Sequence, residues 1–80
     1  MSNKYLATLY YSNVIKITVN GSTGVYETPL AVSQLLQSMA LAGKKVAVER
    51  NGEILPRGAH ASTLLADGDR LEIVAAVGGG

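Results

Sequence analysis

The fold of this chain is decided by the stretch VIKITVNG, residues 14–21, in which apolar and polar side chains alternate. Ile15, Ile17 and Val19 fall on one face of an extended chain and Lys16 on the other, because successive side chains of a strand point to opposite faces. The stretch therefore predicts a half-buried strand.

Two Asn-Gly dipeptides predict tight turns. Asn20-Gly21 ends the first strand, and both central positions of a two-residue hairpin turn favour residues that tolerate positive φ. The segment TGVYET, residues 23–28, is then the return strand. Asn51-Gly52 repeats the signal after a second alternating segment, KKVAVER.

A helical pattern separates these segments. AVSQLLQSMALAG, residues 31–43, has apolar residues at positions i, i+3, i+4 and i+7, which fall on one helical face. This predicted core stripe consists of Val32, Leu35, Leu36 and Met39. Gly43 suits the helix end, whereas Ala31 is a poor N-cap.

A last strand follows the turn Asp67-Gly68-Asp69, with Leu71, Ile73 and Ala75 on one face and Glu72, Val74 and Ala76 on the other. The order of elements predicts an α+β fold, in which a mixed sheet packs on one main helix.

The predicted domain covers residues 14–77, and residues 78–80 form a flexible glycine tail. Residues 1–13 are an N-terminal extension that is either disordered, an added edge strand or sequence ahead of the natural start.

Composition excludes several classes of site. The 80 residues include no cysteine and one histidine, so neither a disulfide nor a thiolate metal site is possible. The net charge of +1 and the lack of Trp and Phe argue against nucleic acid as a partner. We expect neither a signal peptide nor a membrane segment, and hence a cytoplasmic protein.

The chain offers no evident catalytic cluster. We interpret His60 as a surface or turn histidine, because RGAHAST supplies only Ser62 and Thr63 beside it. Asp67 and Asp69 are interpreted as turn residues rather than metal ligands. The chain is therefore expected to be a binding or carrier module, not an enzyme, with no bound cofactor.

The glycine end, Gly78 to Gly80, suggests one kind of carrier chemistry. Glycine lacks a Cβ, so such a tail can enter a narrow channel and present its terminal carboxylate. Joining that carboxylate to AMP gives an acyl-adenylate that a sulfur nucleophile can attack, which leaves a thiocarboxylate. A partner enzyme would supply ATP and Mg²⁺. The alternative is an inert terminus.

The segments VAVERNGEILPR, HAST and the pattern L-x-D-G-D-R-L-E-I-V before the glycine end resemble the ThiS family, the sulfur carriers of thiamine biosynthesis. The resemblance covers roughly residues 14–80. It implies a ubiquitin-like β-grasp fold and adenylation of Gly80 by a ThiF-type adenylyltransferase. It further implies sulfur from a cysteine desulfurase or relay, and delivery to thiazole synthase, ThiG. The shortened helix entry TPLAVSQLL departs from the family pattern.

A partner surface is predicted on the sheet face opposite the helix, from Leu55, Val74, Ala76 and Val77, because exposed apolar clusters often mark partner sites. The alternative is that these side chains pack against the N-terminal extension or against a symmetry-related copy of the chain. Arg57 and Arg70 are candidates for pairing with an acidic partner rim, or are simply solvated.

Three other functions remain open. The chain could be the small subunit of molybdopterin synthase or another sulfur carrier. It could be a ubiquitin-like modifier joined to lysines through Gly80. It could also be a β-grasp binding domain whose glycines are inert, in which case removing Gly79 and Gly80 changes nothing.

Overall fold

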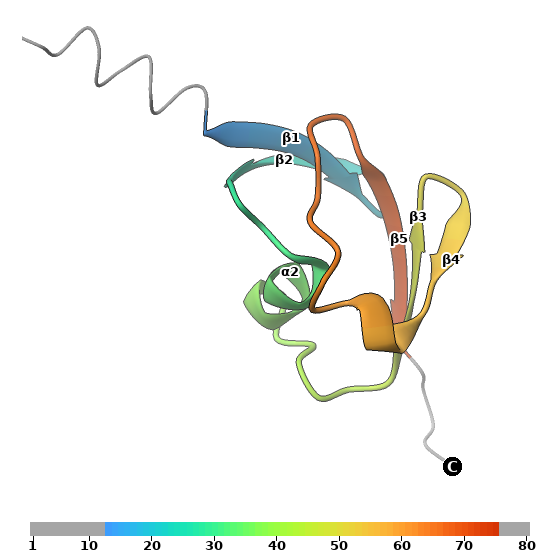
Figure 1. Cartoon of the computed structure of the whole chain (residues 1–80). Coiled ribbons are helices and arrows are strands. Elements are labelled where there is room, and N and C mark those ends of the chain that lie inside the picture. Colours follow the sequence, from blue (N-terminus) through green and yellow to red (C-terminus); the bar gives the residue numbers. More distant parts are fainter. Residues whose placement is uncertain (1–12, 76–80) are drawn as a thin grey trace, which may run out of the picture.

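The computed structural model describes residues 13–75 (Figure 1). Two parts of the chain lie outside the described residues. They are residues 1–12 of the predicted extension and the C-terminal residues Ala76, Val77, Gly78, Gly79 and Gly80. The predicted domain boundaries and the flexibility of the tail therefore stay predictions.

Five strands form one mixed sheet in the order β2-β1-β5-β3-β4. The strands are β1 (Val14–Val19), β2 (Ser22–Glu27), β3 (Val46–Arg50), β4 (Glu53–Leu55) and β5 (Arg70–Ala75). β1 and β5 pair in parallel, and every other pairing is antiparallel. The predicted mixed sheet is confirmed. Sequence reasoning missed β4 as a separate strand.

Both predicted Asn-Gly turns are present. Asn20 and Gly21 have φ values of 49° and 85°, and Asn51 and Gly52 have values of 52° and 87°. The registers leave only these two residues outside each pair of strands, as a tight hairpin requires. The dipeptides thus set the register of β2 and β4.

The helix α2 (Val32–Ser38) ends earlier than predicted. Ala40, not Gly43, is the first residue with positive φ, at 62°. Its N–H donates to Gln37 O at 3.0 Å, and Leu41 N–H donates to Leu36 O at 2.8 Å, the paired bonds of a Schellman end. Met39 consequently caps the helix and is 36% exposed, so its predicted place in the core is wrong.

The helix begins without a side-chain N-cap, as Ala31 predicts. Instead, the Gln34 side chain accepts a hydrogen bond from Ala31 N–H at 2.8 Å. Loop carbonyls take the next donors: Val32 N–H donates to Thr63 O and Ser33 N–H to His60 O. The segment before β5 therefore replaces the missing cap.

The core lies between α2 and one face of the sheet (Figure 1). It is built from the apolar faces predicted for the first strand, the helix and the last strand, with Val48 and Leu65 added. Its buried members are Ile15, Ile17, Val32, Leu35, Leu36, Val48, Leu65, Leu71 and Ile73. The second face of the sheet has no helix packed on it among the described elements.

The element η1 (Arg57–Ala59) is a short 3₁₀ turn that connects β4 to the loop under the helix. It follows β4 at the end of the sheet where β5 also ends, with β3 between the two strands (Figure 1).

Candidate functional site

The strand that leads to the glycines, β5, lies in the middle of the sheet. β1 flanks it on one side and β3 on the other. Its side chains Leu71 and Ile73 are 2% and 6% exposed and belong to the core. The tail therefore starts from one of the best-anchored strands of the molecule.

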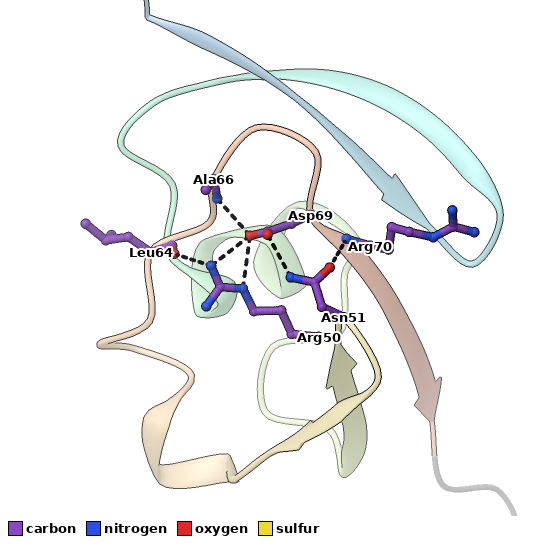
Figure 2. A network of polar contacts seen from close by, with 6 residues as sticks. All are labelled: Arg50, Asn51, Leu64, Ala66, Asp69 and Arg70. Carbon is purple, nitrogen blue, oxygen red and sulfur yellow. Dashed lines mark hydrogen bonds and ion pairs between the residues drawn. The ribbon is translucent and has the colours of Figure 1, made fainter.

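A polar network holds the start of β5 (Figure 2). Asp69 accepts hydrogen bonds from Arg50 Nε at 3.0 Å, Asn51 Nδ2 at 3.0 Å and Ala66 N–H at 2.8 Å. The Arg50 guanidinium also forms an ion pair with Asp69 at 2.9 Å and donates to Leu64 O at 3.4 Å. One carboxylate thus ties the β3–β4 turn to the loop that enters β5.

The same network determines the ionisation of Asp69, whose side chain is buried. Burial raises the pKa of this carboxyl, but the hydrogen bonds from Ala66, Asn51 and Arg50 and the charge of Arg50 together outweigh burial and lower it. Asp69 was predicted to be an ordinary turn residue, and the structure gives it a buried structural role instead.

The side chains of two asparagines form hydrogen bonds with the backbone of β5, one on each side of the strand. Asn51 Oδ1 accepts from Arg70 N–H at 2.9 Å, on the β3 side. On the β1 side, Asn20 Oδ1 accepts from Ile73 N–H at 2.8 Å and Asn20 Nδ2 donates to Ile73 O at 3.1 Å. The two turn asparagines therefore satisfy backbone groups of β5 where the neighbouring strands have turned away.

The far end of β5 is held on one side only among the described residues. Ala75 is paired with Val46 of β3, whereas the paired residues of β1 reach only Leu71. Five residues follow Ala75 up to and including Gly80, and five residues span at most about 17 Å when fully extended.

The predicted partner surface needs one correction. Leu55 pairs with Val48 in register, so its side chain lies on the core face, where it is half-buried. Val74 lies on the opposite face and is 64% exposed. Ile54, which is 68% exposed, takes the place of Leu55 on that face. Counting residues forward from the Asn51-Gly52 turn would have placed Ile54 on that face.

His60 also differs from its interpretation. It follows η1 in a turn, as expected, but it is buried, with 7% of its surface exposed. Its Nε2 has no hydrogen-bond partner in the described part of the chain.

Within residues 13–75, no group of three or more His, Asp or Glu side chains could hold a metal ion. No helix in that range is long and apolar enough to cross a membrane.

Together, a five-stranded mixed sheet with a central parallel pair, one helix across one face and a C-terminal glycine segment after the central strand define a ubiquitin-like β-grasp protein. The sequence model of the ThiS family matches residues 8–80. The chain belongs to the ThiS family.

Solved structures of one relative agree with this assignment. The crystal and solution structures of thiamine biosynthesis protein ThiS from Geobacter metallireducens are 38% identical to this chain and superpose with a TM-score of 0.68. Each match covers 82% of this chain, and 100% and 88% of those two chains respectively.

Curated relatives are of two lengths. A thiazole synthase from Paramagnetospirillum magneticum is 42% identical over 66 residues, which are 82% of this chain but 20% of that protein. The uncharacterized protein ycf40 of Pyropia yezoensis is 38% identical over 72 residues, which cover 90% of this chain and all of that protein. The chain thus spans about a fifth of the thiazole synthase that it matches.

Proposed function

We propose that this chain is a sulfur carrier for the thiazole half of thiamine, with the Gly80 carboxylate as its working group. One observation carries the proposal: the ThiS-family match runs through the glycine end to residue 80. The structural relatives are named for thiamine biosynthesis, and two matched proteins are named thiazole synthase.

The proposed chemistry has two steps. In the first, the Gly80 carboxylate attacks the α-phosphorus of ATP on a ThiF-type adenylyltransferase, which forms the acyl-adenylate and releases pyrophosphate. In the second, sulfide attacks the acyl carbon, a C–S bond forms and AMP leaves. The product is a thiocarboxylate at Gly80. ATP and Mg²⁺ bind to the partner enzyme, and the carrier is its protein co-substrate rather than an enzyme.

In the cell, we propose that a cysteine desulfurase or a relay protein supplies the sulfur in the cytoplasm. Thiazole synthase then takes the sulfur from the thiocarboxylate. The carrier's own contribution is recognition and reach, since β5 is anchored at its start and leaves five residues beyond Ala75.

The exposed sheet face is the proposed first contact with these partners. Val74 and Ile54 lie on it, and Ala47 pairs with Val74 in register. Ala76 and Val77, which the sequence also assigns to this surface, lie outside the described residues. Exposed apolar clusters of this kind are typical of partner sites.

The test is the intact mass of the chain after incubation with ATP, Mg²⁺, a ThiF-type enzyme and sulfide. We expect the gain that corresponds to one oxygen replaced by sulfur, localised to Gly80. No gain, with the enzyme active on another carrier, would leave a β-grasp domain with inert glycines. Adducts to lysines of other proteins would instead indicate a modifier.

A further inference from the structure

A second recognition element lies at the end of the molecule from which the tail departs. A pocket of about 270 Å³ opens between the loop after α2 and the η1 turn, and Leu36, Leu41, Lys44, Arg57 and His60 help to line it. Val46, two residues after Lys44, is the register partner of Ala75 at the end of β5. The loop and η1 lie near that end of β5 in Figure 1.

The charge of this pocket is uncompensated. Lys44 and Arg57 are both exposed, and no Asp or Glu lines the pocket. Within residues 13–75 the one ion pair is that of Arg50 with Asp69, so neither cation has an acidic partner there. The pocket is therefore lined by apolar side chains and by two cations with no carboxylate among the lining residues.

The lining histidine supplies an independent observation. His60 is 93% buried, from its 7% exposure, and its Nε2 is enclosed without a hydrogen-bond partner. Buried polar atoms are nearly always paired, so an unpaired one requires an explanation. Because His60 also lines the pocket, an acceptor that enters the pocket is a candidate partner for this nitrogen.

We infer that this pocket receives an acidic side chain of the thiazole synthase that takes the tail. The inference rests on the proposed function. A protein that accepts Gly80 approaches the end of the sheet at which β5 ends, and the pocket with Lys44 and Arg57 lies at that same end. A carboxylate on an apolar stem matches the apolar lining, pairs with the two cations and accepts a hydrogen bond from the imidazole. The pocket fixes the orientation of the carrier, while the apolar sheet face supplies contact area.

The experiment measures binding of the full chain to a thiazole synthase of the same organism by calorimetry, at low and high NaCl. The variants are Lys44→Glu and Arg57→Glu. Lys45→Glu is the matched control, because Lys45 is an exposed neighbour of Lys44 in the same loop but does not line the pocket. We expect Kd to rise roughly tenfold for each pocket variant at low salt, and less at high salt. The control should stay near wild type.

His60→Leu separates a ligand role from a structural one. If the imidazole awaits a partner group, removing it should weaken binding several-fold without lowering Tm, because an unpaired buried nitrogen contributes nothing favourable to the fold. A fall in Tm with unchanged Kd would mark His60 as a purely structural residue and overturn its part in the inference.

Two results would overturn the pocket itself. If the wild type, both pocket variants and the control have equal Kd values, the pocket does not take part in binding. The proposed function still stands in that case, provided that the wild type gains sulfur at Gly80. Absence of any binding by a wild type that does gain sulfur would remove thiazole synthase as the occupant. Failure to gain sulfur would instead contradict the proposed function.

Discussion

The two ends of β5 are built differently. At its start, Asp69 is buried and accepts from Arg50, Asn51 and Ala66, so its carboxylate is well paired. At the end of the sheet where β5 ends, the pocket holds two cations without acidic partners in the described structure and the unpaired nitrogen of His60. The start of the strand is suited to stabilising the fold, and the end of the sheet beyond it is suited to binding an acidic group of a partner protein.

The largest effect should come from the tail. Removing Gly80, or replacing Gly79 by Trp, should abolish formation of the acyl-adenylate, because the terminal carboxylate then ends one residue short of the reaction site or cannot pass a narrow channel. Thermal unfolding should be unchanged, since the buried members of the core all lie between Ile15 and Ile73. The check is ATP–pyrophosphate exchange with the ThiF-type enzyme. A Gly79→Trp chain that still reacts with ATP would contradict the channel argument.

The opposite result is expected at the start of β5. Asp69→Ala leaves Arg50 without its carboxylate and two further donors unpaired, and should lower the free energy of unfolding by about 3 kcal/mol. Glu53→Ala is the control, because Glu53 is exposed. Urea denaturation measures both. At a temperature where the variant stays folded, its adenylation should be close to that of the wild type. A loss of adenylation in the folded variant would contradict the purely stabilising role of Asp69.

Asn20 tests the β1 side of the strand. Asn20→Gly preserves the positive φ but removes two hydrogen bonds to Ile73, and should cost about 1–2 kcal/mol of unfolding free energy. Asn20→Ala should cost roughly 1 kcal/mol more, because alanine is strained in the left-handed region. Equal stabilities of Asn20→Gly and wild type would show that the side-chain ladder contributes nothing.

The smallest effect is a dependence on pH. The pKa of Asp69 is lower in the folded chain than its ordinary value of 3.8, so the unfolded chain binds the proton more tightly. This contribution to stability is fully present above the unfolded pKa and is lost as pH falls through the folded pKa. Unfolding free energies should therefore decline below about pH 4 more steeply in wild type than in Asp69→Asn. Parallel curves would contradict the assignment.

Local signals predicted most of the fold. Alternation in VIKITVNG and the two Asn-Gly dipeptides act within a few residues, so they identified β1 and both hairpin turns correctly. The helix end was wrong because Ala40 adopts a left-handed conformation that only the Schellman bonds reveal.

Burial of polar residues in the candidate sites could not be predicted in the same way. Asp69 is buried by contacts with Arg50 and Asn51, which lie 19 and 18 residues away in the chain. His60 is covered by tertiary packing, and no neighbour in RGAHAST signals this. The face of Ile54, by contrast, followed from the turn register and was within reach of the sequence.

The parallel pairing of β1 with β5 also has a consequence for biosynthesis. It joins residues about fifty positions apart, such as Val19 with Leu71, and β5 is the last strand of the described chain. Such distant contacts form late, because the intervening chain must be ordered first. During translation the sheet therefore cannot close until its central strand has left the ribosome. Chains that lack β5 lose the middle of the sheet as well as the glycines, so a closed sheet and a complete glycine end occur together in the same finished chain.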